Sequence, residues 1–402
     1  MQPLSITGIG IVNSLGIGVE ETWKNLLHGE TGIRAVTWDD KADKDFYFSE
    51  YLAKCPVKIG APLRELPGCP IEEFEKDWRH LDPSIQIALH STWQAITDAN
   101  LQSKNVAVIF GSIGSSHVRS EGCDAMARGR TKFPPRKTLN FELGHMTAII
   151  SRMFGFVGPS LMVHTACSTG LTAMDYAQRM LETDPELEAV VIGGGDLPLE
   201  ATSAFYFSNL QALTQTECKP FSEDRSGFVL GEGGGCMVLE RAKDAKSKKV
   251  YANILATAGV TVGEHETSPD HAGLAAQQAA LKAIKSANIT PEDIGYINAH
   301  ATGTVVGDVI EYNAMMNILP ERIMTANKGH IGHTICSSGI IETAYTALAL
   351  RDQITPLVAN LTQACGQGMH LPIRAENINA QYAIKNNYAF GGRSMSVVLG
   401  KA

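Results

Sequence analysis

Short apolar runs alternate along the chain with longer stretches in which apolar residues recur at helical spacing. The short runs, typical of buried strands, cover residues 106–110, 189–192, 251–255, 294–298 and 395–399. The longer stretches cover residues 171–181, 272–287 and 340–350. This alternation predicts an α/β protein in which helices cover mixed or parallel sheets.

A charged stretch at residues 240–249, ERAKDAKSKK, interrupts this alternation and is the best candidate for a boundary. We therefore divide the chain into two halves, residues 1–245 and residues 246–402. Each half contains a strand that runs into a turn of small residues, HTACSTG at 164–170 and NAHATG at 298–303. An internal duplication would explain this similarity, but strand–turn–helix units are common enough to produce it by chance.

The composition is that of a well-buried enzyme rich in tight turns, with 44% hydrophobic residues, 19% charged residues and 38 glycines among 402 residues. A net charge of −8 disfavours nucleic acid as the main partner, although a local basic patch can still bind an acidic protein. No apolar run is long enough to span a membrane, and the N-terminus lacks the features of a signal peptide. We therefore expect a cytoplasmic protein without a membrane or nucleic-acid partner.

The eight cysteines are scattered without a Cys-x-x-Cys pair, so neither a disulfide framework nor a metal site is expected. Cys167 differs from the others because it follows an apolar strand and lies where a helix is expected to begin. Backbone N–H groups and the helix dipole favour the thiolate at such a position, and the thiolate is the reactive form. Cys167 is therefore the candidate nucleophile, whereas the other cysteines are expected to be inert packing residues.

Two further segments carry histidines that are suited to act with this cysteine. His300 leaves the end of a predicted strand into a Thr/Gly turn, and strand ends are where α/β sheets build their sites. Residues 327–333, NKGHIGH, contain His333 in a glycine-rich turn just before an apolar helix. Nucleophilic catalysis needs distant residues of these types to converge.

Two glycine-rich segments complete the set. Residues 220–235, PFSEDRSGFVLGEGGG, look like a phosphate loop only superficially, because no Gly-Lys-Ser/Thr follows and the next element is a strand. Nucleotide binding is therefore not expected. Residues 386–392, NNYAFGG, precede the last strand, and their paired glycines let the backbone approach a ligand closely.

Together these segments resemble the β-ketoacyl-acyl-carrier-protein synthases of the elongating type, which are condensing enzymes with the thiolase fold. The opening ITGIGIVNSLGIGVEETWKNLLHGETGI is similar to that of the family, and TACSTG, PFSEDRSGFVLGEGGG, NAHATGTVVGD, KGHIGH and AFGG follow in the family's order. The resemblance spans nearly the whole chain. It implies a five-layer αβαβα fold with two pseudo-symmetric halves, and a homodimer or a heterodimer with a related ketosynthase-like subunit.

The resemblance also implies roles for individual residues. Cys167 matches the nucleophile that becomes acylated, and His300 and His333 match the pair that supports malonyl decarboxylation. Lys328 matches the lysine that supports these histidines, and Glu342 matches its carboxylate partner.

Other positions carry supporting roles. Asp308 and Glu311 match the acidic pair that follows the first histidine. Phe390 matches a gate residue whose N–H group, together with that of Cys167, is expected to form the oxyanion hole. His330 matches no functional residue of the family.

The implied reaction is the decarboxylative Claisen condensation of an acyl thioester on Cys167 with malonyl-acyl carrier protein, in fatty acid or polyketide biosynthesis. No metal or other cofactor is expected, because decarboxylation drives the reaction and the carrier protein brings its own phosphopantetheine arm. Basic positions that the family uses to bind the carrier protein align with Lys76, Arg79, His80, Arg136 and Lys137.

Several positions depart from the family pattern without removing a catalytic group. They are Ala389 for Gly, Arg393 and Ser394 for Thr and Asn, Gly307 for Asn, Ser226 for Asp, and Cys336 with its two following serines for a Gly/Ala run. These departures leave a specialised polyketide or polyene pathway open beside fatty-acid synthesis.

Two alternative functions also stay open. One is a non-catalytic subunit of the chain-length-factor type, which looks similar but lacks the cysteine that this chain retains. The other is a degradative thiolase, which typically has a second cysteine near the C-terminus. The segment AFGGRS contains no such cysteine.

Overall fold

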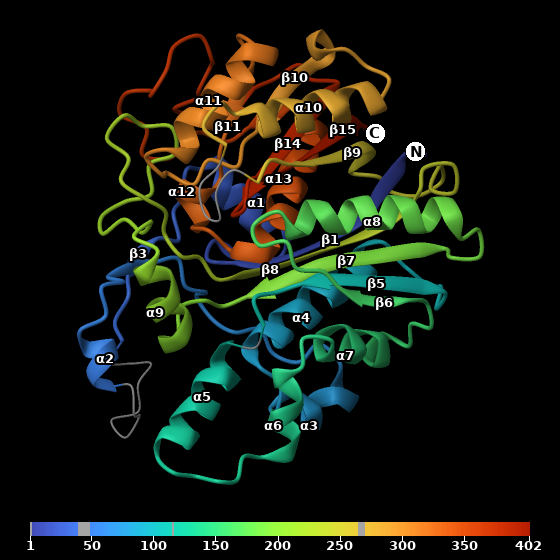
Figure 1. Cartoon of the computed structure of the whole chain (residues 1–402). Helices are drawn as coiled ribbons and strands as arrows, with labels where there is room; N and C mark the ends of the chain where they lie inside the picture. Colours follow the sequence, from blue (N-terminus) through green and yellow to red (C-terminus); the bar gives the residue numbers. More distant parts are fainter. Residues whose placement is uncertain (1, 39–48, 115, 264–269) are drawn as a thin grey trace.

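The computed structural model describes residues 2–38, 49–114, 116–263 and 270–402 (Figure 1). The main strands of the first half are β1 (Leu4–Asn13), β5 (Val106–Gly111), β6 (Ser160–Met162), β7 (Ala189–Asp196) and β8 (Gly233–Arg241). Those of the second half are β9 (Ala252–Thr261), β10 (Ile294–Asn298), β11 (Ile323–Thr325), β14 (Tyr382–Ala389) and β15 (Arg393–Lys401). They form one sheet in the order β11-β10-β14-β15-β9-β1-β8-β7-β5-β6, and β2 (Gly16–Ile17) pairs with β1.

The two halves of this sheet have the same topology. Numbered along the chain within each half, the strands lie in the order third, second, fourth, fifth, first. In both halves the second strand runs parallel to the third and fourth, and the fifth runs antiparallel to the fourth and first. The two first strands, β1 and β9, join the halves by a short antiparallel pairing. The two pseudo-symmetric halves that the resemblance implied are therefore confirmed.

Helices divide the molecule into five layers, as Figure 1 shows. Helices α8 (Thr169–Thr183) and α13 (Ser338–Asp352) contact strands of both halves and form the central layer. Helices α4 (Pro83–Asp98) and α7 (His145–Phe154) cover the outer face of the first half. The outer face of the second half is covered by α10 (Leu274–Ser286), against which α11 (Gly307–Ile318) packs. The expected αβαβα arrangement is thus present.

The central helix α13 is buried on every side from Ser338 to Leu350, because a sheet half lies on each side of it. Its sequence has no polar stripe, as expected for a helix without a solvent-facing side. Glu342 lies in the middle of this helix and is completely buried. A carboxylate in such a place needs a buried cationic partner.

The structure extends the strand predicted at 189–192 and shortens the link between the halves predicted at 240–249. The run at 189–192 continues as β7 through Gly193, Gly194 and Gly195 instead of ending there, because β8 pairs with it along its whole length and β5 pairs with it as far as Gly194. A Cβ atom at Gly195 would lie 2.5 Å from the main-chain oxygen of Ser84 in α4, so helix and strand can approach this closely only without a side chain. Residues 240 and 241 belong to β8, so the link between the halves begins after them.

The remaining elements are shorter or lie outside the main layers. The helices are α1 (Val19–Leu27), α2 (Ser49–Ala53), α3 (Glu75–Trp78), α5 (Ser116–Ala127), α6 (Pro135–Thr138), α9 (Ala201–Asn209) and α12 (Lys328–Ile331). The 3-10 turns are η1 (Glu72–Phe74), η2 (Leu139–Phe141), η3 (Pro291–Asp293) and η4 (Ile335–Ser337). Two small strand pairs are β3 (Arg34–Ala35) with β4 (Ile59–Gly60), and β12 (Ile354–Thr355) with β13 (Glu376–Asn377). Over the residues that the structure describes, no helix has the length and apolarity that crossing a membrane requires.

Candidate active site

Cys167 lies on a strained turn between β6 and α8. Ala166 has a φ of 49°, in the left-handed region that residues with a Cβ atom avoid. Thr169 holds this turn, because its hydroxyl donates to the Ala166 oxygen at 2.6 Å and accepts from the Thr165 N–H at 2.9 Å. The turn places the cysteine at the start of the central helix α8, as the sequence predicted.

His300 follows β10 and is held by the first turns of α11. Glu311 accepts hydrogen bonds from the N–H groups of His300 and Ala301 at 2.9 and 2.8 Å. Asp308 accepts from the N–H groups of the next three residues and from that of Phe221. Both acidic residues therefore act on the main chain of the His300 turn.

His333 comes close to the segment 220–235 through a residue that must be glycine. Gly332 has a φ of 66° and a ψ of −174°, and a Cβ atom there would lie 2.9 Å from Gly231. The N–H of His333 donates to the Val229 oxygen at 2.7 Å, and the N–H of Gly231 donates to the His333 oxygen at 3.0 Å. The segment that looked like a phosphate loop thus supports the backbone of His333.

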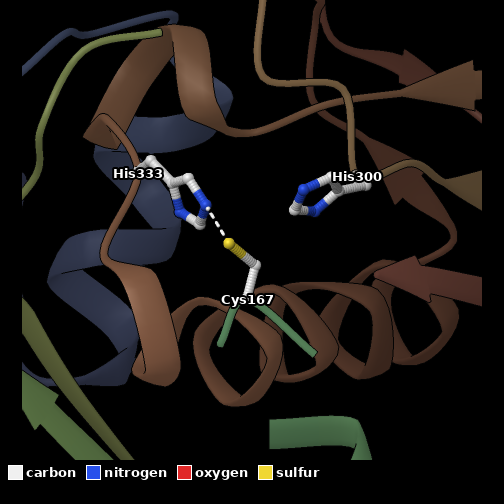
Figure 2. Close-up of side chains that lie close together, drawn as sticks. All are labelled: Cys167, His300 and His333. Carbon is white, nitrogen blue, oxygen red and sulfur yellow. Dashed lines mark hydrogen bonds between the residues drawn. The ribbon is translucent and has the colours of Figure 1, made fainter. Parts of the chain in front are cut away.

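These turns bring the predicted nucleophile and both histidines together. The Nε2 atom of His333 lies 3.0 Å from the Sγ atom of Cys167. The ring centres of His300 and His333 are 5.5 Å apart with an interplanar angle of 81°. Figure 2 shows the two imidazoles on either side of the space above the thiol.

Hydrogen bonds at the Nδ1 atom of each ring define the tautomers of both histidines. The N–H of Ile335 donates to Nδ1 of His333 at 3.2 Å. The Nδ1 atom of His300 lies 3.1 Å from the side-chain nitrogen of Asn387 and 3.4 Å from Nζ of Lys328. Because Nδ1 is the acceptor in each ring, the proton of each neutral imidazole lies on Nε2. Both histidines then present an N–H group near Cys167.

Burial keeps these imidazoles uncharged. It lowers the pKa of His300 and of His333 well below 6.5, and the positive charge of Lys328 lowers both further. Neutral histidines with protonated Nε2 atoms are hydrogen-bond donors, which suits them to stabilise an oxyanion.

The expectation that the start of a helix favours the Cys167 thiolate is wrong. Burial raises the pKa of the thiol to about 12, and the positive charge of Lys328 offsets this only in part. The sulfur sits at the inner end of a cavity, so the cost of desolvating its charge exceeds what the helix start supplies. The resting nucleophile is therefore a neutral thiol.

A buried group of charges lies beneath the histidines. The Nζ atom of Lys328 donates to the His300 oxygen at 2.8 Å and to Oε1 of Glu342 at 2.6 Å. The Nζ atom of Lys385, on β14, lies 2.9 Å from Oε2 of the same carboxylate. Glu342 therefore bridges two lysines, and all three side chains are fully buried.

Sequence reasoning identified Lys328 and Glu342 but missed Lys385 and Asn387. Burial lowers the pKa of Lys385 to about 8, although the negative charge of Glu342 opposes this shift. The sequence signal was a lysine two residues before an asparagine, which places both side chains on the same face of a strand. His330, to which no role was given, lies buried between the main-chain oxygens of Glu30 and Leu357.

The nucleophile and histidines also have the spacing of a metal site. Cys167, His300 and His333 bring one sulfur and two nitrogen atoms within 4.8 Å of one another. A metal ion would need the lone pairs of both Nε2 atoms, but the hydrogen bonds at Nδ1 place protons there. Two buried lysines also lie beside the site. The residues therefore favour hydrogen-bond donation over metal binding.

A cavity of about 460 Å³ leads to the nucleophile. Aromatic side chains of Phe228, Tyr388 and Phe390 line it together with both histidines. Most of the positions that depart from the family pattern also line this cavity, namely Ser226, Gly307, Ala389, Arg393 and Ser394. Cys336 is buried instead.

The five basic residues predicted to bind the carrier protein lie on and near α3 and α6. The two helices are adjacent, since Arg136 lies 3.4 Å from Asp77. Lys137 is also ion-paired, at 2.6 Å from Glu121. Acidic neighbours therefore offset two charges of the patch, whereas Lys76 and Arg79 are exposed and His80 is half-buried.

Known proteins resemble the chain over its whole length. Family models match residues 1–245 as the N-terminal domain and residues 251–362 as the C-terminal domain of β-ketoacyl synthases. A 3-oxoacyl-[acyl-carrier-protein] synthase 2 from Vibrio harveyi is 32% identical, with 98% of each chain covered.

Solved structures show the same fold. The ishigamide ketosynthase/chain length factor has a TM-score of 0.88 at 23% identity, covering 100% of this chain and 99% of that one. A type II polyketide ketosynthase in complex with its acyl-carrier protein has a TM-score of 0.85 at 22% identity, with 100% and 99% coverage.

Proposed function

This chain belongs to the β-ketoacyl synthase family, and we propose that it condenses an acyl group on Cys167 with malonyl-acyl carrier protein to give 3-oxoacyl-acyl carrier protein. The name of the Vibrio harveyi relative states this activity. The observation that carries the proposal is the pair of neutral imidazoles whose Nε2–H groups lie near the Cys167 thiol. Enolate stabilisation requires donors of this kind.

In the first half-reaction, the Cys167 sulfur attacks the thioester carbonyl of an acyl-carrier protein. The new bond joins sulfur and the acyl carbon, the bond to the carrier sulfur breaks, and the proton of the cysteine thiol ends on the carrier thiol. The main-chain N–H groups of Cys167 and Phe390 are the proposed oxyanion hole. Removal of one such donor typically slows a reaction about 100- to 1000-fold.

In the second half-reaction, the bond between the malonyl methylene and its carboxylate breaks, and carbon dioxide leaves. The electron pair forms an enolate whose oxygen accepts hydrogen bonds from His300 and His333. The enolate carbon then attacks the acyl carbon on Cys167, and the cysteine leaves as a thiolate that takes up one proton. Lys328, paired with Glu342, donates a hydrogen bond to the main-chain oxygen of His300 and so helps to position this histidine. Asp308 and Glu311 hold the main chain of the His300 turn.

The two alternative functions fit the site less well. A non-catalytic subunit has no need for a cysteine beside two oriented histidines. A degradative thiolase is disfavoured because the family models match β-ketoacyl synthases over both halves.

The proposed partner is an acyl carrier protein, which supplies phosphopantetheine as part of the substrate, so we propose no resident cofactor. The basic residues on and near α3 and α6 support this partner, because carrier proteins are acidic and charge complementarity steers association. The similar type II polyketide ketosynthase was solved in complex with its own acyl-carrier protein. We place the reaction in the cytoplasm, where all eight free cysteines would stay reduced.

We also propose a dimer of two such chains, or of this chain with a related subunit. Strand β11 at one edge of the sheet is covered by residue His370, which pairs with Ile323. Strand β6 at the other edge pairs only with β5 among the described residues. An open edge is suited to pair with its own copy around a two-fold axis.

The pathway remains either fatty acid or polyketide synthesis. Most of the departures from the family pattern line the cavity, which supports a specialised acyl substrate such as a polyketide or polyene chain.

One reconstitution tests the proposed activity. The purified protein is incubated with acyl- and malonyl-carrier proteins, and the products are weighed by mass spectrometry. We expect a 3-oxoacyl-carrier protein lengthened by two carbons and one carbon dioxide per product. An acyl adduct on Cys167 without any such product would contradict the proposal.

A further inference from the structure

Asn387 connects the nucleophile with one of the histidines. It lies on β14 and is completely buried. Its side-chain nitrogen is 3.2 Å from the main-chain oxygen of Cys167 and 3.1 Å from Nδ1 of His300. One amide group therefore contacts residues that come from different halves of the chain.

The orientation of this amide follows from its neighbours. If the amide were turned around, its oxygen would face the Cys167 oxygen at a similar distance, and two acceptors would repel each other. The –NH₂ group therefore points toward both neighbours. It donates one hydrogen to the Cys167 oxygen and the other to Nδ1 of His300.

Lys328 is the other donor near Nδ1 of His300, but it is less well placed than Asn387 to donate to this atom. Its Nζ atom lies 3.4 Å from Nδ1 of His300 and makes shorter contacts with the His300 oxygen and with Glu342. By contrast, Nδ1 of His333 accepts a hydrogen bond from the main-chain N–H of Ile335. A main-chain donor thus fixes the tautomer of His333, whereas the tautomer of His300 depends on side-chain donors.

We infer that Asn387 is a positioning residue that keeps the proton of His300 on Nε2 and ties the histidine to the main chain of the nucleophile. The inference rests on the proposed function of His300 as a donor to the enolate oxygen. Without Asn387, His300 could carry its proton on Nδ1 and turn a lone pair toward the substrate. Such an imidazole would repel the enolate oxygen instead of stabilising it.

Two substitutions of similar size separate orientation from packing. Asn387→Asp replaces a donor by an acceptor, so it should draw the proton of His300 to Nδ1. We expect malonyl decarboxylation to fall about 100- to 1000-fold, which is the usual effect of losing one oxyanion donor, while acyl transfer to Cys167 falls far less. Asn387→Leu removes the donor without adding an acceptor, and we expect a smaller loss with a mixture of tautomers.

The tautomer itself is measured by ¹⁵N NMR of protein labelled at histidine, with His300→Asn identifying the signal. We expect a proton on Nε2 in the wild type and on Nδ1 in Asn387→Asp. The matched control is Asn386→Ala, because this equally buried asparagine contacts Met315 and Ser396 instead of the site. That variant should keep both half-reactions and the tautomer.

An unchanged tautomer in Asn387→Asp, or equal losses of both half-reactions, would overturn the inference. If that variant does not fold, an unchanged proton on Nε2 in Asn387→Leu has the same meaning. A wild type that does not decarboxylate malonyl-carrier protein would refute the proposed function. The NMR result would still decide the position of the proton.

Discussion

The Nε2 atom of His333 lies 3.0 Å from the sulfur of Cys167, although 166 positions separate the two residues in the chain. The contact joins the start of α8 in the first half to the turn before α13 in the second. Since these are the two helices of the central layer, the repeated topology builds the site at their adjoining ends.

The thiol of Cys167 should be weakly reactive at neutral pH. Burial raises its pKa to about 12, so the thiolate fraction should grow about tenfold per pH unit throughout the range 7 to 9.5. Alkylation by iodoacetamide, followed at this residue by peptide mass spectrometry, should therefore show no plateau near pH 8.5. Cys167→Ala identifies the modified peptide, and a plateau below pH 9 would contradict the raised pKa.

Replacing either histidine should separate the two half-reactions. His300→Ala and His333→Ala each remove one Nε2–H donor, so carbon dioxide release from malonyl-carrier protein should fall about 100- to 1000-fold. Cys167 should still accept some acyl group in both variants, as intact-protein mass spectrometry measures. His90→Ala, which changes a histidine outside the site, is the control. Decarboxylation at the wild-type rate would exclude that histidine from the reaction.

The elements around the site could be predicted well from local sequence. The runs at 106–110 and 294–298 are strands, as their short apolar character predicts, and the longer apolar stretch at 340–350 is a helix. Cys167 and His300 were found because each follows the end of a strand in a turn of small residues.

The supporting residues were harder to find for a physical reason. Both faces of β14 are buried, so its sequence gives no alternation to show that Lys385 and Asn387 face the site. The pKa of Cys167 was misjudged for a related reason. A helix start is visible in the sequence, but the depth of burial depends on which distant segments close over the sulfur.

Among the buried charges, Glu342 should matter most for stability. Glu342→Gln leaves Lys328 and Lys385 facing each other without their shared carboxylate, whereas replacing either lysine by Met leaves Glu342 one partner. Removal of a buried ion's partner costs about 3–5 kcal/mol. We therefore expect the unfolding free energy in urea to fall most in Glu342→Gln. A larger loss in Lys328→Met would show that the lysines do not share the carboxylate equally.

The basic patch should control binding of the carrier protein. Arg136→Glu combined with Lys137→Glu should raise KM for malonyl-carrier protein, and the effect should be larger at low salt, where charges are less screened. Asp77→Asn should lower KM, because it releases Arg136 and Arg152 from their shared carboxylate.

The control for this patch is Arg179→Glu, which reverses an exposed arginine that is also ion-paired but lies on α8. It should leave KM unchanged. If the double reversal also leaves KM unchanged at low ionic strength, the carrier protein binds elsewhere.

The turn between β14 and β15 should determine which acyl chains enter the cavity. Ala389 pairs with Arg393 across this turn, and Phe390 at its tip lines the cavity. Gly392 cannot be replaced, because a Cβ atom there would lie 1.8 Å from the Val262 oxygen. The freedom of the turn therefore depends on its other residues, and alanine at 389 restricts the backbone more than glycine would.

We expect Ala389→Gly combined with Arg393→Thr to change the chain-length or unsaturation preference while decarboxylation stays near normal. The exposed guanidinium of Arg393 contributes a long, permanently charged side chain to the cavity wall, and Cys167, His300 and His333 lie outside this turn. Competition between acyl-carrier proteins of several lengths measures the preference, and each single variant shows which residue is responsible. An unchanged preference in the double variant would favour the alternative, in which Arg393 forms a surface or dimer salt bridge. That role would instead appear as weaker dimerisation or a lower melting temperature, because the charge would then act on assembly instead of on the passage of the acyl chain to Cys167.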